Sequence, residues 1–252
     1  MNGYSLTTEA CGKEIFIRRH FSDGSAGVCR CLIRRLTPED YSAALTLHDE
    51  VSHGLSREIF AASSPADIAR FLSDEACAVG VWREKKLVAL RTIKLSDAWT
   101  AEALKDYGLA GDCGEKPAVT GFCVVDWEFR GNNVQFLTYY MSEELVSRSH
   151  DSLFTTVSPK NIFSLENILK CNFRIIGINK VYGGYLRFIL KKNFRPTFAP
   201  LWTHGHEQIP IRDKKRQLDA LANGYAGYRL VRKPSGFHIL YAQVSTEPPE
   251  KR

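Results

Sequence analysis

The 252-residue sequence predicts an α/β fold in which helices lie on both faces of a mixed sheet. Two observations support this prediction. The first half contains two pairs of strand-like runs, each pair joined by a turn-rich or polar connection, which is typical of antiparallel hairpins. The second half alternates strand-like runs with amphipathic helical runs, which is typical of α/β architecture.

Six elements are expected in the first half of the chain: strands at 14–21, 29–36, 76–82 and 87–95, and helices at 38–52 and 56–74. Thr37 and Pro38 predict the start of the first helix, because a hydroxyl group caps free amides and proline suits the first turn. We expect the second helix to be interrupted or re-capped near Ser64-Pro65.

The second half begins with a loop and a short helix at 96–117. Further elements follow: strands at 118–127, 153–157, 174–179 and 185–190, and helices from 134 and at 162–169. Val134, Leu137, Met141 and Leu145 recur at helical spacing. We therefore expect these four side chains to form the buried face of their helix.

We divide the chain into four parts: an N-terminal strand and loop at 1–28, a main domain at 29–198, a C-terminal extension at 199–247 and a tail at 248–252. The extension is predicted to contain a helix followed by a β-hairpin. The helix lies near 212–222, and the two strands of the hairpin lie at 227–233 and 236–244.

Composition excludes several kinds of site and partner. The formal net charge is +6, but the basic residues are spread along the chain, so nucleic acid is not expected as a partner. The seven cysteines form no Cys-x-x-Cys motif, which argues against zinc or a disulfide framework and for a reducing cytoplasm. The run His204-Gly205-His206-Glu207 has no third ligand at a suitable spacing, so we expect an exposed loop and no metal. No apolar run reaches the roughly 18 residues of a membrane span, so no membrane is expected.

The run VDWEFRGNNVQ, residues 125–135, joins a predicted strand to a predicted helix. The first amides of a helix lack acceptors within the helix and carry partial positive charge, so they can bind a pyrophosphate. Arg130 can add a charged contact, and Gly131, Asn132 and Asn133 suit a left-handed turn that gathers these amides. An ordinary helix cap is the alternative that these residues leave open.

The same run resembles the first signature of the GNAT superfamily of acyl-CoA-dependent N-acyltransferases, Val-x-Pro-Glu-(Tyr/Phe)-Arg-Gly-x-Gly-(Ile/Val)-Gly before a helix. Six positions match: Val125, Glu128, Phe129, Arg130, Gly131 and Val134. Trp127 replaces the proline, and Asn133 and Gln135 replace the later glycines. A second signature is matched by Asn161, which leads a helix, and by Asn172-Phe173 in the place of Gly-Phe.

The resemblance covers about residues 29–195 and implies a GNAT-like splayed mixed sheet flanked by helices, with acetyl-CoA or another acyl-CoA as co-substrate. The pyrophosphate would contact backbone amides of the turn, which belong to Arg130, Gly131, Asn132, Asn133, Val134 and Gln135. Backbone groups of Val124 and Val125 would hold the pantetheine arm and the acyl carbonyl. Asn161 or Ser164 would contact the cofactor from the following helix.

Catalysis needs a proton acceptor for the amine and a proton donor for the thiolate. Many family members have a glutamate on the strand at 119–125 and a tyrosine in the second-signature helix. This sequence has no glutamate at 119–125, and Ile168 occupies the tyrosine position. By resemblance, Tyr182 and Tyr185 border the acceptor pocket and are the candidate catalytic residues. A packing role for both, with a base that acts through water, is the alternative.

We therefore expect a cytoplasmic acetyltransferase, monomeric or homodimeric, that transfers an acyl group from acetyl-CoA to a primary amine of a small molecule. Three alternatives stay open. The chain could be a non-catalytic acyl-CoA-binding or sensor module, an enzyme that acetylates a protein or peptide amine, or a basic interaction protein without a cofactor.

Overall fold

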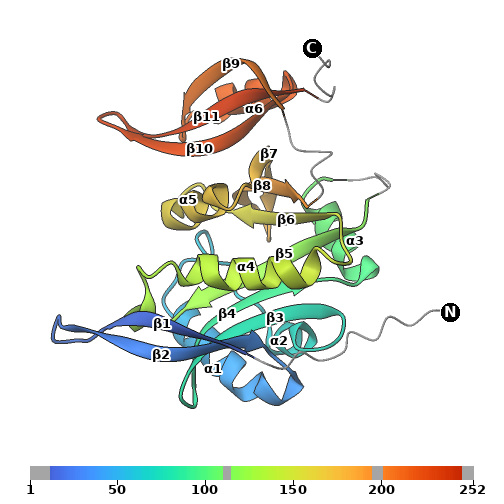
Figure 1. Cartoon of the computed structure of the whole chain (residues 1–252). Helices are drawn as coiled ribbons and strands as arrows, with labels where there is room; N and C mark the ends of the chain where they lie inside the picture. Colours follow the sequence, from blue (N-terminus) through green and yellow to red (C-terminus); the bar gives the residue numbers. More distant parts are fainter. Residues whose placement is uncertain (1–11, 110–114, 195–200, 246–252) are drawn as a thin grey trace, which may run out of the picture. The chain divides into compact units, whose positions relative to one another are not determined.

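A computed structural model describes residues 12–109, 115–194 and 201–245, and Figure 1 shows its helices and strands. Contacts divide the chain into two compact units. The first unit comprises Met1–His53, Ser63–Thr92 and Phe122–Ser142, and the second comprises Gly54–Ala62, Ile93–Gly121 and Glu143–Arg252. Three elements contribute residues to both units: β4 (Lys86–Lys94), β5 (Pro117–Val125) and α4 (Val134–Val146).

The strands of the first unit follow the order β1-β2-β3-β4-β5. The first three are β1 (Lys13–His20), β2 (Ala26–Arg35) and β3 (Ala76–Arg83). β1 pairs with β2 and β2 pairs with β3, in both cases antiparallel. Glu84 and Lys85 form the two-residue turn between β3 and β4, and Glu84 takes a positive φ of 53°. The predicted strands of this half are confirmed.

Two helices belong to the first unit, α1 (Tyr41–Ser52) and α2 (Pro65–Phe71). The predicted start of α1 is confirmed, because a 3-10 turn at Pro38–Asp40 leads into it. The predicted cap near Ser64-Pro65 is confirmed, but the prediction that the helix already begins at 56 is wrong, since residues 55–64 are not helical. Ser64 Oγ accepts the Asp67 amide at 3.1 Å, and proline at the next position has no amide to donate, so the helix begins there.

The strands of the second unit follow the order β5-β6-β8-β7-β10-β11-β9. β6 (Ser152–Val157) is parallel to β5 through three residue pairs, Pro117–Val119 with Ser152–Phe154. β8 (Tyr185–Asn193) is antiparallel to β6 and to β7 (Arg174–Val181). The sheet is therefore mixed, as predicted.

Two helices of the second unit, α3 (Asp97–Asp106) and α5 (Ile162–Lys170), each follow a polar residue at the N-cap position. A buried cluster joins α3 and the residue after it to four strands, and its members are Ala103, Tyr107, Val119, Phe154, Val181 and Ile189. Burial of such apolar side chains is the main driving force for folding.

The C-terminal extension consists of β9 (Leu201–Pro210), α6 (Lys214–Ala222), β10 (Tyr225–Lys233) and β11 (Gly236–Ser245). The predicted helix and the two strands of the β-hairpin are present. The extension is mainly strands, with one helix and no helical hairpin among its described residues. Reading the His204–Glu207 run as a loop was wrong, because β9 pairs with β11 through His206↔Ala242 and Glu207↔Tyr241. An edge strand can carry exposed polar side chains, so hydrophobic alternation did not reveal it.

The buried face of α4 differs from the predicted one. Val134 is buried, but Leu137, Met141 and Leu145 are only partly buried. The other buried positions of α4 are Thr138, Tyr139, Ser142 and Val146. Two of these four residues, Thr138 and Ser142, have short polar side chains. The hydroxyl groups of Thr138 and Ser142 donate to helix carbonyls, at 3.0 Å to Val134 O and 2.9 Å to Tyr139 O. Because these hydroxyls are satisfied within the helix, they can be buried, which a purely apolar pattern cannot predict.

Two asparagines adopt the left-handed conformation at the positions where the GNAT signatures have glycine. Asn133, before α4, has φ 58°, and Asn172, after α5, has φ 67°. Asparagine is among the few residues that tolerate this region. The substitutions therefore preserve the backbone conformation that glycine supplies in the signatures. Among the described residues, no helix is long and apolar enough to cross a bilayer.

Asn172→Ala should lower the free energy of unfolding by about 1 kcal/mol, because alanine lacks the polar side chain that helps asparagine tolerate a left-handed backbone. Asn172→Gly is the matched control and should stay within about 0.5 kcal/mol of the unmodified protein, since glycine adopts this conformation without steric cost. Urea denaturation measures both. An alanine variant as stable as the glycine variant would contradict this account of the helix end.

Candidate functional site

Two carboxylates, those of Asp126 and Glu128, stabilise the connection between β5 and α4, and each is paired with a cation. Asp126 is buried, its Oδ1 accepts the Glu128 amide at 3.0 Å, and its Oδ2 lies 2.7 Å from Lys86 Nζ. The hydrogen bond to Asp126 raises the pKa of Lys86, so the ammonium stays charged. Glu128 pairs with Arg19 at 2.7 Å. These contacts account for both carboxylates as structural groups of the 3-10 turn at Trp127–Phe129.

Four consecutive backbone amides in this connection have no acceptor among the described residues. The Arg130 amide donates to Trp127 O, and the helical ladder of α4 begins with the Phe136 and Leu137 amides, which donate to Asn133 O. The amides between them that lack an acceptor belong to Gly131, Asn132, Asn133 and Val134. Gly131 and Asn133 both have positive φ, 78° and 58°. A left-handed turn before the positive end of a helix dipole is suited to binding an anion.

Side chains fix the conformation of this turn. Arg130 Nε donates to Val125 O at 3.1 Å, so the exposed guanidinium stays at the end of β5. Asn132 Nδ2 donates to Arg18 O and to Phe129 O, which ties the turn to β1. Val124 and Val125, predicted to contact the cofactor through their backbones, are buried at the end of β5.

A buried arginine that the sequence analysis missed lies beside the first turns of α4. Arg91, on β4, is 2% exposed and has no carboxylate within ion-pair distance in the described part of the chain. Its Nη2 donates to Gln135 O at 3.1 Å, and its guanidinium lies 5.6 Å from the Tyr139 ring. This cation adds positive charge near the open amides. Its only signal in the sequence is a charged residue inside an apolar strand, LVALRTIKL.

In the second unit, Asn161 and Ser164 form the cap of α5. Asn161 Oδ1 accepts the Ser164 amide at 3.2 Å, and both residues are partly buried. An N-cap role therefore explains asparagine at this position. A contact of either residue with a cofactor stays a prediction.

Tyr182 lies in the turn between β7 and β8 and forms a hydroxyl network. It is 41% exposed, and its φ of 54° is unusual for a tyrosine. Its hydroxyl lies 3.2 Å from the Tyr107 hydroxyl and 3.0 Å from Thr156 Oγ1. Burial raises the pKa of Tyr107 well above its usual value, so Tyr107 stays protonated. The three hydroxyls come from the C-cap of α3, from β6 and from the β7–β8 turn. These segments are distant in sequence, so no local pattern indicates the network.

Tyr185 lies close to a second buried arginine. Arg187 is 2% exposed, and its guanidinium lies 5.8 Å from the Tyr185 ring and 5.7 Å from the Tyr182 ring. It donates to Arg57 O at 3.0 Å, and no carboxylate is within ion-pair distance among the described residues. Desolvation lowers the pKa of Arg187, although the group remains a cation at neutral pH. Tyr182 and Tyr185 therefore flank one buried positive charge.

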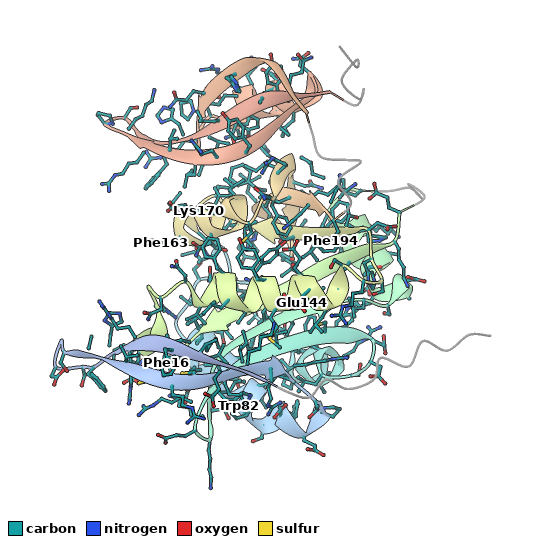
Figure 2. All side chains as sticks on the ribbon, viewed as in Figure 1. Phe16, Trp82, Glu144, Phe163, Lys170 and Phe194 are labelled. Carbon is teal, nitrogen blue, oxygen red and sulfur yellow. The ribbon has the colours of Figure 1, made fainter. Side chains whose placement is uncertain are left out.

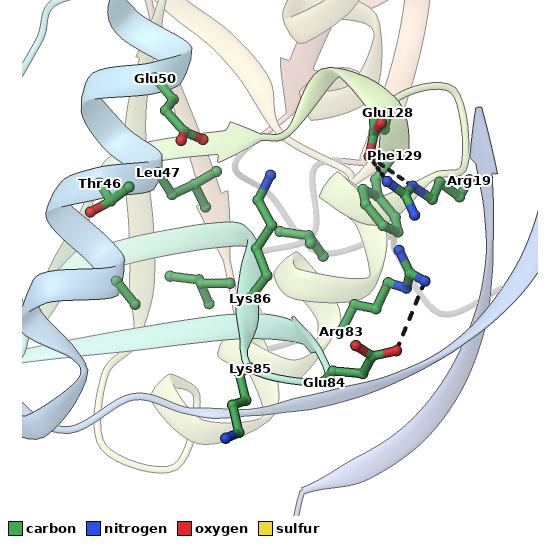
Figure 3. Close-up of a pocket in the computed structure, with 13 residues that line it drawn as sticks. Arg19, Thr46, Leu47, Glu50, Arg83, Glu84, Lys85, Lys86, Glu128 and Phe129 are labelled. Carbon is green, nitrogen blue, oxygen red and sulfur yellow. Dashed lines mark hydrogen bonds and ion pairs between the residues drawn. The ribbon is translucent and has the colours of Figure 1, made fainter. Parts of the chain in front are cut away.

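A cavity of about 490 Å³ lies in the first unit, and Figure 3 shows its lining. α1 contributes Leu47, the β3–β4 turn contributes Lys85, and the start of β4 contributes Lys86. Arg19 and Glu128 pair with each other across one side of it. The cavity contains none of the predicted cofactor or catalytic residues, and we assign no ligand to it.

Comparison with models of protein families finds no match, and neither does comparison with curated proteins. Solved structures do match. An acetyltransferase of the GNAT family from Streptococcus pneumoniae has a TM-score of 0.51 and 17% identity, covering 65% of this chain and 98% of that chain. The ribosomal-protein-S18-alanine N-acetyltransferase from Escherichia coli has a TM-score of 0.51 and 13% identity, covering 69% and 99%. Arabidopsis thaliana NAA60 in complex with acetyl-CoA has a TM-score of 0.50 and 12% identity, covering 65% and 98%.

These matches define the class of the fold. The chain has the mixed α/β fold of the GNAT acetyltransferases, so the resemblance carried by its two sequence signatures is confirmed at the level of the fold. The neighbours are matched over nearly their whole length, whereas roughly a third of this chain has no counterpart in them.

Proposed function

We propose that the chain is an acetyl-CoA-dependent N-acyltransferase that acylates a primary amine of a small molecule. The observation that carries the proposal is the group of four open amides, Gly131 to Val134, on a chain with the GNAT fold. These donors, the positive end of α4 and the adjacent Arg130 fit the two negative charges of a pyrophosphate. One neighbour with this fold is described in complex with acetyl-CoA, which supports the choice of co-substrate.

The end of β5 and the turn before α4 supply the proposed cofactor contacts. Amides from Arg130 to Gln135 hold the pyrophosphate, and backbone groups of Val124 and Val125 hold the pantetheine arm and the acyl carbonyl. Arg91 raises the positive potential at the same helix end. Bound acetyl-CoA supplies a thioester, whose carbonyl carbon forms the new bond to the amine nitrogen as the carbon–sulfur bond breaks.

Tyr182 is the proposed proton donor. A thiolate leaving group requires one proton, and the amine must lose one. Tyr182 has an exposed hydroxyl, which Tyr107 and Thr156 hold in place. Tyr185, beside Arg187, is the second candidate and lines the acceptor side of the site in this proposal. The amine passes its proton to water, because no carboxylate lies on β5 between Val119 and Val125.

A non-catalytic acyl-CoA-binding or sensor module is the second candidate. The observation that favours it is the loss of both usual proton carriers, since Ile168 is a buried apolar residue in the tyrosine position. The sensor would use the same open amides. It differs from the enzyme in releasing no thiol.

Arg130→Ala should weaken acetyl-CoA binding about tenfold in isothermal titration calorimetry, because an exposed charge-assisted contact is worth about 1.4 kcal/mol. Arg148→Ala is the matched control, since Arg148 is exposed beyond the far end of α4. The control should keep the affinity of the unmodified protein. Equal affinities for the two variants would show that Arg130 makes no phosphate contact. Absence of binding to the unmodified protein at about 1 mM acetyl-CoA would contradict both the enzyme and the sensor.

A thiol-release assay with acetyl-CoA across a panel of primary amines tests catalysis. We expect at least one small amine to release thiol, and Tyr182→Phe to lower kcat about 100-fold while the KM for acetyl-CoA stays unchanged. Tyr140→Phe, a change at an exposed tyrosine on α4, should leave kcat unaltered. A Tyr182→Phe variant with full kcat would exclude Tyr182 as the proton donor. Binding without thiol release for every amine would favour the sensor.

A further inference from the structure

The described part of the C-terminal extension is strongly basic. Residues 201–245 contain seven Lys and Arg residues and three Asp and Glu residues, which is a net charge of +4 out of the +6 of the whole chain. The basic residues fall into two runs, one at 212–216 and one at 229–233. Neither run is long enough to indicate a basic tract in the sequence.

The fold brings the two runs to one place, the closed end of the β10–β11 hairpin. In the register of this hairpin, Arg232 is opposite Phe237 and Lys233 is opposite Gly236. The Ile211 amide donates to Phe237 O at 3.0 Å, so the turn that leads into α6 lies at the same end. We call the resulting surface the basic end, formed by Arg212, Lys214, Lys215, Arg232 and Lys233. Figure 1 shows the hairpin and α6, and Figure 2 shows side chains with terminal nitrogens at its closed end.

These cations are available to a partner. All five side chains are exposed, and none has a carboxylate within ion-pair distance among the described residues. The neighbouring Arg216, by contrast, lies 3.8 Å from Glu207. Asp213 is the one acid within the two runs, and its Oδ1 accepts the Arg216 amide as the cap of α6. Like charges held together without counter-charges produce a strong positive potential.

The chemistry of the basic end selects one kind of partner. Within the described side chains of the extension, Leu218 is the one large hydrophobic residue that is exposed, and Phe237 is partly covered by the Arg232 guanidinium, 5.9 Å from its ring. Protein interfaces usually have an apolar core, and membrane-surface binding uses apolar side chains that insert. Binding to the phosphates of a nucleic acid requires neither, because Lys and Arg release counterions from a dense line of charge.

We propose that the basic end binds the phosphate backbone of a nucleic acid. This differs from the expectation drawn from the sequence, in which the basic residues are dispersed. The basic end shares no residue with the site proposed to bind acetyl-CoA. The two proposals can therefore fail independently.

Fluorescence anisotropy of the full chain with a labelled RNA of mixed sequence, about 30 nucleotides long, tests the proposal. If about four phosphates are neutralised, Kd should rise roughly 50-fold between about 50 mM and about 200 mM salt. The double variant Lys214→Glu/Lys233→Glu should bind at least tenfold more weakly at the lower salt concentration. Its dependence on salt should also be shallower.

The matched control is Lys85→Glu/Lys105→Glu, which changes the net charge by the same amount at two exposed lysines elsewhere. This control should bind RNA within twofold of the unmodified protein, and circular dichroism checks that both double variants are folded. Equal weakening in the two double variants, or no saturable binding at the lower salt, would overturn the proposal. Tighter binding to polyglutamate or to phosphatidylserine vesicles than to RNA would also overturn it.

Discussion

The proposed function depends on a strand-to-helix connection in which four backbone amides have no acceptor among the described residues. An amide without an acceptor is costly when buried, so such groups persist where water or a ligand can reach them. Gly131 and Asn133 set the left-handed turn, Asn132 ties it to β1, and the Asp126–Lys86 pair holds the residues before it. Arg130 is held at the end of β5 by its bond to Val125 O, and Arg91 adds positive charge beside the turn.

The second physical theme is the presence of two buried arginines that have no carboxylate partner within the described part of the chain. Arg91 in the first unit and Arg187 in the second are each nearly inaccessible to solvent and bonded to backbone carbonyls. Burying a charge is expensive unless it is hydrogen-bonded or paired. The carbonyl bonds and the tyrosine rings offset part of this cost. Tyr182 and Tyr185, the proposed proton donors, lie beside one of these cations, Arg187.

Local signals in the sequence predicted much of the fold and the turn. Strand alternation predicted the hairpins, and the left-handed tolerance of asparagine predicted the conformation of Asn133. Features that depend on distant contacts were missed. The buried face of α4 includes Thr138 and Ser142, whose hydroxyls are satisfied within the helix, and β9 is defined by its pairing with β11. The Tyr107–Thr156–Tyr182 network and the basic end each join segments that only the fold brings together.

The most direct test of the central claim is an NMR titration of the ¹⁵N-labelled protein with acetyl-CoA, followed in amide correlation spectra. We expect the amides of Gly131, Asn132, Asn133 and Val134 to show the largest shifts, because they gain acceptors on the pyrophosphate. The amides from Lys85 to Val88, which line the cavity, should move little. Unchanged signals for the four turn amides at about 1 mM ligand, or larger shifts at the cavity, would contradict the account.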